Sequence, residues 1–117
     1  MMVETTASIR VAAIQMQAGL GEVDSNLRAA SDLVEEAVRQ GARLVVLPEF
    51  FTSAMAMHRS LLEAPRPIDG EPTRLLTDLA RRHGILVGGS FLAIHPDGEV
   101  RNTFVLAGPD GVVGMHD

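Results

Sequence analysis

The strongest constraint on the fold is the apolar run at residues 44–47, which ends abruptly at Pro48 and Glu49. Polar residues do not alternate with apolar ones in this run, so it predicts a strand buried on both faces, as in a parallel sheet covered by helices. Ligands of such sheets bind beyond the carboxyl ends of the strands, where Glu49 lies. Because Phe50 and Phe51 follow this carboxylate, we expect its charged form to be poorly solvated, which suits a general base. A solvated Glu49 that only ends a strand is equally compatible with this position.

The residues before this run predict a strand–helix–strand unit. Residues 9–16 are rich in apolar side chains and predict a first strand. A helix follows, with Asp24 or Ser25 as its expected cap and Gly41 as its stop. Its apolar face consists of Leu27, Ala30, Val34, Ala37 and Val38. A strand, a helix and a second strand in this order predict a right-handed crossover between parallel strands.

A long irregular segment, residues 52–69, follows the buried strand and carries Met55, Met57 and His58. A loop of this length that leaves the carboxyl end of a buried strand is often functional. These side chains could line a substrate pocket, although we favour packing of the loop onto the core. His58 has no partner in view, so we assign it no catalytic role.

The second half of the chain predicts a helix followed by antiparallel strands. Pro72 suits the first turn of the helix and Gly84 its end. Residues 85–94 predict a strand in which Gly88 and Gly89 indicate a close approach by a neighbour. Turn residues at 96–98 and 108–111 then separate the strands predicted at 99–107 and from 112 onward. Asn102 is either a polar outward residue or a side chain that hydrogen-bonds a neighbouring loop.

Composition and charge narrow the class of function. The chain has 117 residues, which suits one domain, and its net charge is -5. No cluster of basic residues is present and only 3% of residues are aromatic, so nucleic acid and membrane surfaces are not expected partners. The start of the chain lacks the pattern of a secretory signal, so a cytoplasmic location is expected.

The residues that could carry chemistry form an incomplete set. The chain contains no cysteine and no lysine. Its four histidines have no metal-ligand spacing, so neither a metal nor another cofactor is expected. Ser53 and Ser90 are the plausible hydroxyl nucleophiles near strand ends, and neither lies in a Gly-x-Ser-x-Gly elbow. Glu49 therefore remains as a candidate base, with Phe50, Phe51 and Met55 as candidate substrate-binding residues.

Several short segments form a series along the chain. The first ones are residues 9–16, Asn26-Leu27 and residues 41–51, which contain a Leu-Pro-Glu-Phe motif. The later ones are Gly70-Glu71-Pro72, residues 85–90, Asn102-Thr103 and Pro109-Asp110-Gly111. In order and spacing, residues 9–117 resemble the N-terminal portion of the nitrilase, or carbon–nitrogen hydrolase, superfamily. Residues 1–8 are expected to form a disordered tail.

The resemblance implies an α/β fold that forms the N-terminal part of an α-β-β-α sandwich, with homo-oligomers as the usual assembly. It also implies a Glu–Lys–Cys triad that hydrolyses a small amide, carbamoyl compound or nitrile, and among these we favour a small non-peptide amide. Glu49 matches the glutamate of the triad. The lysine would be expected just past Asp117 and the cysteine further on. We therefore expect a truncated domain that is inactive alone, because without the nucleophile no acyl-enzyme forms.

Other hypotheses remain open at this point. The chain could be a naturally short, non-catalytic α/β protein that binds a partner or a small molecule in the half-site. An unrelated nucleotide-binding domain is disfavoured, because Gly19 and Gly21 are followed by Asp24 where the third glycine of that motif would lie.

Overall fold

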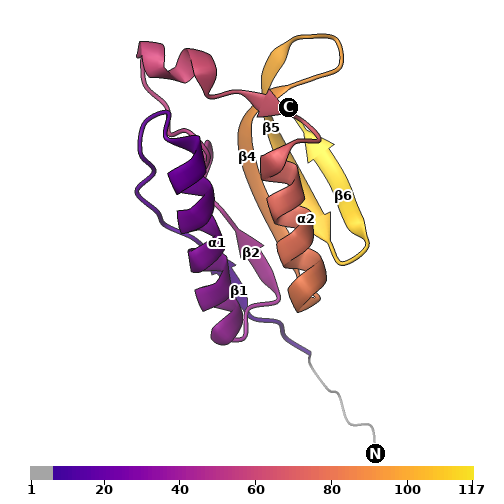
Figure 1. Ribbon diagram of the computed structural model, residues 1–117. Helices are drawn as coiled ribbons and strands as arrows, with labels where there is room; N and C mark the ends of the chain where they lie inside the picture. Colours follow the sequence, from indigo (N-terminus) through magenta and orange to yellow (C-terminus); the bar gives the residue numbers. More distant parts are fainter. Residues whose placement is uncertain (1–6) are drawn as a thin grey trace, which may run out of the picture.

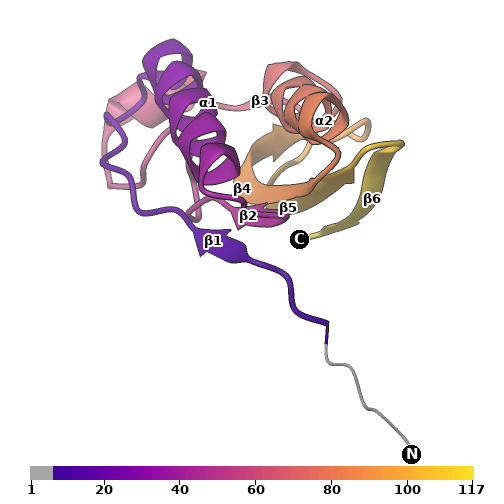
Figure 2. The ribbon, with the colours of Figure 1, turned by 90° about the horizontal axis from the view of Figure 1, so that it is seen from below.

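In the computed structural model, which describes residues 7–117, one mixed sheet is covered on one face by two helices (Figures 1 and 2). The strands run in the order β1 (Val11–Ala13), β2 (Leu44–Val46), β4 (Leu86–Ile94), β5 (Val100–Gly108) and β6 (Gly111–His116). A two-residue strand, β3 (Arg66–Pro67), pairs with β4 beside this path. The α/β class is therefore confirmed. Of the predicted tail, residues 1–6 lie outside the described residues.

The strand–helix–strand unit forms with parallel strands, since β1 pairs in parallel with β2 and β2 with β4. Helix α1 (Val23–Arg39) begins before both predicted caps, with Glu22 at its N-cap and no side-chain cap. Val23 is buried, so packing of the first turn outweighs the capping preference of Asp24 or Ser25. Gly41, with a φ of 89°, follows the helix as predicted.

The second helix and the antiparallel strands also form as predicted. Helix α2 (Glu71–His83) has Pro72 in its first turn and ends at Gly84 in the left-handed conformation. Strand β5 pairs antiparallel with β4 on one side and with β6 on the other. The segment at residues 52–69 is less irregular than expected, because it contains a 3-10 helix, η1 (Arg59–Glu63), and strand β3.

The two faces of the sheet differ, and this corrects the prediction that residues 44–47 are buried on both faces. Both helices lie on the same side of the sheet (Figure 2). On that side Val45, Val87, Val105 and Leu79 are fully buried. Leu44 and Val46 are only half-buried, because no element of the described chain covers the other side. We call the two sides the covered face and the uncovered face.

The glycine pair in β4 leaves room for an aromatic ring on each face. A Cβ atom at Gly88 would lie 2.5 Å from Cζ of Phe104, and one at Gly89 would lie 2.9 Å from Cδ1 of Phe51. The expected close approach is therefore confirmed, and the approaching groups are side-chain rings. Within residues 7–117, no helix has the length and hydropathy that crossing a membrane requires.

Candidate active site

Glu49 lies just past the carboxyl end of β2, where the parallel strands β2 and β4 both end toward one edge of the sheet. Its side chain is exposed, which corrects the expectation of a poorly solvated carboxylate. The reason is the direction of its neighbours. Phe51 points into the core and is fully buried, whereas Phe50 is half-buried, so neither ring shields Glu49 from solvent.

The turn that carries Glu49 has an unusual backbone. Phe50 has a φ of 56° and Ala54 a φ of 54°, in the left-handed region that residues with a Cβ rarely adopt. Each such residue costs about 1–3 kcal/mol, so other contacts must hold it in place. Strand β4 supplies two of them, because the amide of Phe50 donates to the Ser90 hydroxyl and the amide of Phe51 to the Ser90 carbonyl, both at 3.2 Å. Ser90 therefore fixes the backbone on which Glu49 sits.

A second tie comes from Asn26 in the first turns of α1, which is 3% exposed. Its Nδ2 donates to the carbonyl of Gly19 at 2.7 Å and to that of Thr52 at 2.9 Å. Its Oδ1 accepts the amide of Gly19 at 2.8 Å. Asn26 thus joins the loop before α1 to the turn after Glu49. The sequence analysis did not assign this role to Asn26. A signal was present, because Asn26 is a polar residue on the apolar face of the helix, four positions before Ala30.

An open depression of about 440 Å³ lies beside Glu49 on the uncovered face. It is lined by Val46, Leu47, Glu49, Ser90, Asn102, Phe104, His116 and Asp117. Strands β2, β4, β5 and the end of β6 all contribute to it. The sequence pointed to Glu49, but nothing in the spacing of the chain indicated that His116 would lie in the same depression.

The predicted substrate-binding residues do not line this depression. Phe51 belongs to the core, and Phe50 contributes to the turn. Met55 is 50% exposed and Met57 is fully exposed, so the favoured packing of the loop onto the core is also wrong for these side chains. The loop instead presents them to solvent beside η1. His58 is exposed too, and its Nδ1 accepts the amide of Ser60 at the start of η1.

The two candidate hydroxyl nucleophiles differ in position, because Ser90 lines the depression and Ser53 does not. The Ser53 hydroxyl donates to the carbonyl of Ala54 at 2.8 Å, and Ser53 is buried away from the depression. Ser90 is 6% exposed and its hydroxyl accepts the Phe50 amide. Within residues 7–117, neither hydroxyl is hydrogen-bonded to Glu49, so this carboxylate is not paired with a hydroxyl that it could activate.

Asn102 is the other polar side chain of interest in the depression. Its Oδ1 is buried and has no hydrogen-bond partner among the described residues, so of the two alternatives the bond from this atom to a neighbouring loop does not form. A buried carbonyl oxygen without a partner costs about 1–3 kcal/mol, which makes Asn102 a conspicuous group beside Glu49.

A larger depression, of about 600 Å³, lies around Arg10 and Arg43 at the other end of the strands, and no acidic residue lines it. No group of three or more His, Cys, Asp or Glu residues within 7–117 could hold a metal ion.

Comparison with known proteins assigns the family. The carbon-nitrogen hydrolase family matches residues 10–116, so the chain belongs to this family. It is 37% identical over 113 residues to a nitrilase from Pyrococcus abyssi, covering 92% of this chain and 42% of that relative. It is 36% identical over 107 residues to omega-amidase NIT2 from Danio rerio, covering 92% of this chain and 38% of the relative. The nitrilase superfamily resemblance seen in the sequence is confirmed.

Solved structures support the same fold. A CN-hydrolase superfamily protein from Xanthomonas campestris superimposes with a TM-score of 0.83 at 24% identity, covering 96% of this chain and 41% of that one. Nit3 from Saccharomyces cerevisiae, a member of the nitrilase superfamily, gives a TM-score of 0.76 at 26% identity, covering 92% of this chain and 43% of that one. The chain therefore spans less than half the length of these relatives.

Proposed function

We propose that these 117 residues carry the general-base part of a carbon–nitrogen hydrolase site that acts on a small non-peptide amide, with Glu49 as the base. The observation that carries the proposal is the position of Glu49 in a depression at the carboxyl end of β2, on a turn held by Ser90. A base must reach the proton that it takes, and an exposed carboxylate in an open depression meets this condition. Omega-amidases and a nitrilase among the relatives support a substrate with an amide or nitrile carbon.

The proposed mechanism needs a nucleophile that the 117 residues do not contain. In the triad that the family resemblance implies, a cysteine attacks the substrate carbon, a glutamate removes and returns protons, and a lysine stabilises the developing negative charge. Since the chain has neither cysteine nor lysine, both groups would have to come from outside these residues. Members of such a catalytic unit act together, so a lone Glu49 gives almost none of the rate enhancement.

The first test compares two variants of the protein at its native length, assayed against linear amides, carbamoyl amines and nitriles. Glu49→Gln keeps the shape of the side chain and removes its basicity, so we expect kcat to fall by about 10²–10⁴-fold. Glu63→Gln, an equally exposed change in η1, serves as the matched control and is expected to retain full activity. Unchanged hydrolysis by Glu49→Gln would refute the assignment of the base.

The second test uses the 117-residue chain alone, which we expect to hydrolyse none of these substrates. Turnover by this chain that Glu49→Ala abolishes would overturn the requirement for an external nucleophile. Binding of a substrate by the native-length protein without any turnover would instead favour the non-catalytic alternative. Isothermal titration calorimetry distinguishes this outcome from a complete absence of binding.

A further inference from the structure

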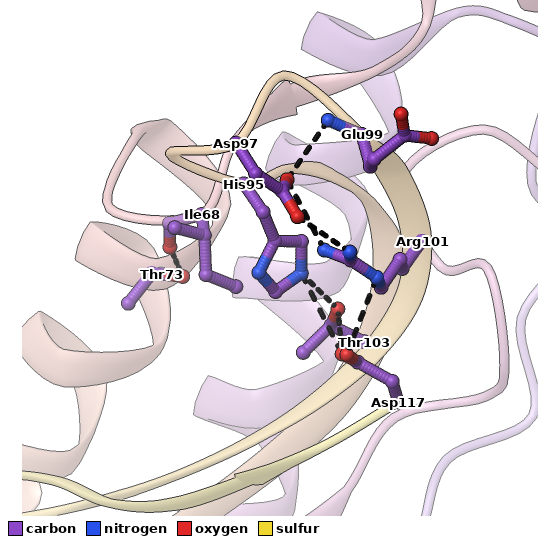
Figure 3. A network of polar contacts seen from close by, with 8 residues as sticks. All are labelled: Ile68, Thr73, His95, Asp97, Glu99, Arg101, Thr103 and Asp117. Carbon is purple, nitrogen blue, oxygen red and sulfur yellow. Dashed lines mark hydrogen bonds and ion pairs between the residues drawn. The ribbon is translucent and has the colours of Figure 1, made fainter.

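A polar network surrounds the carboxylate of Asp117, just past the end of β6 (Figure 3). The hydroxyl of Thr103 donates to Oδ1 of Asp117 at 2.6 Å, and Nε2 of His95 lies 2.8 Å from the same hydroxyl oxygen. A hydroxyl has one proton to donate. Because Thr103 gives it to Asp117, the Nε2 atom of His95 carries the proton of the second bond. Thr103 is fully buried, so this chain of bonds is shielded from solvent at its centre.

Arg101 completes the surroundings of this carboxylate. Its Nε lies 3.8 Å from Oδ2 of Asp117, and its Nη2 donates to Asp97 at 2.6 Å. The bonds from Arg101 and from the Glu99 amide hold the pKa of Asp97 below its usual value, so the aspartate stays charged and orients the guanidinium. The Asp117 carboxylate is therefore contacted by Thr103, by Arg101 and, at 3.5 Å, by His95.

Asp117 connects the depression beside Glu49 with the covered face, because it lines the depression and also bonds to Thr103. Successive residues of a strand point to opposite faces, and β6 pairs with β5 so that His116 faces Phe104. Both of these residues line the depression on the uncovered face. Thr103 and Val105 are buried on the covered face, and Asp117, at the edge of the depression, accepts a hydrogen bond from Thr103. A slip of one residue would exchange the two faces of β6.

We propose that Asp117 is a positioning residue, whose contacts with Thr103, His95 and Arg101 fix the end of β6 so that His116 faces the depression beside Glu49. This inference rests on the proposed hydrolase function, because that function gives the depression its chemical role. The buried Thr103 hydroxyl is the central contact. The ion pair with Arg101 contributes less, because Asp117 is about half exposed and solvent screens its charge.

The test uses the protein at its native length and reads two quantities for each variant, amide hydrolysis and hydrogen–deuterium exchange at residues 114–117. Thr103→Val removes the hydroxyl and keeps the shape, whereas Thr103→Ser keeps the hydroxyl and should rescue the protein. Asp117→Ala removes the carboxylate, and Asp110→Ala, an exposed change in the turn of the same hairpin, is the control.

We expect Thr103→Val and Asp117→Ala to lower kcat at least about tenfold with little change in KM, since a small misplacement of reacting groups costs up to about 100-fold. Exchange at residues 114–117 should quicken in both, and Thr103→Ser and Asp110→Ala should match the wild type. A kcat within twofold of the wild type in Thr103→Val and Asp117→Ala would overturn the proposal. If the wild-type protein hydrolyses no substrate, the proposed function fails, and exchange alone decides. Equal protection in the Thr103→Val and Thr103→Ser proteins would then refute the positioning role.

Discussion

The covered and uncovered faces of this sheet use the same strands for different purposes. On the covered face, side chains from β2, β4 and β5 pack against α1 and α2 as one continuous hydrophobic core. On the uncovered face, the alternate residues of the same strands are half-buried, and polar groups such as Glu49, Asn102 and His116 stand among them. Successive residues of one strand therefore serve different purposes: one packs into the core and the next faces the depression. The packed core on the covered face fixes the strands, and the strands fix the polar side chains on the uncovered face.

The largest expected effect comes from removing bulk on each face in turn. Leu79, in α2, is fully buried against the covered face, so Leu79→Ala should lower the free energy of unfolding by about 2–5 kcal/mol. Leu106, in β5, is half-buried on the uncovered face, so Leu106→Ala should cost about 1 kcal/mol or less. Urea unfolding of the 117-residue chain measures both values. Equal costs would mean that the uncovered face is packed as tightly as the covered one.

The glycine pair in β4 gives a second comparison with a smaller difference. Gly89→Ala places a methyl group against Phe51, which is fully buried, so we expect the free energy of unfolding to fall by about 1–3 kcal/mol. Gly88→Ala places a methyl group against Phe104, which is only half-buried on the uncovered face, so we expect a smaller loss. Thermal unfolding of the two variants tests the order. The reverse order would show that Phe104 is held more rigidly than Phe51.

The smallest expected effect is a pH dependence of the free energy of unfolding, which arises from Glu35 in α1 and its contacts with α2. Contact with His83, and then with Arg82, holds the pKa of Glu35 below its usual value. A carboxylate with a lowered pKa stabilises the folded state at neutral pH, and this contribution is lost as the pH falls below about 4.5. Glu35→Gln should therefore be less stable than the wild type at pH 7, with a gap that narrows toward pH 3. Asp32→Asn, an exposed change on the same helix, serves as the matched control. A gap that stays constant from pH 7 to pH 3 would contradict the assignment.

Much of the fold could be predicted from the sequence because its signals are local. Gly41 and Gly84 end helices by adopting positive φ angles, and Pro72 belongs in a first turn, whatever surrounds them. The start of α1 could not be predicted from its capping residues, because burial of Val23 depends on contacts distant in the sequence. The exposure of Met55 and the burial of Phe51 could not be predicted for the same reason. An apolar residue has the same sequence signal whether its side chain packs into the core or faces solvent. Homo-oligomer formation stays a prediction.

By itself, the sequence determined the α/β class, the family and the candidate carboxylate at Glu49, because a short motif and its spacing suffice for these. Only the tertiary structure decided what surrounds that carboxylate. Ser90 and Asn26 hold the turn after β2 through bonds to Phe50, 40 positions from Ser90, and to Thr52, 26 positions from Asn26. No periodicity of the sequence reveals these bonds. His116 and Asp117 reach the depression because β6 pairs with β5. Long-range pairing brings these groups together, and local sequence patterns carry no information about it.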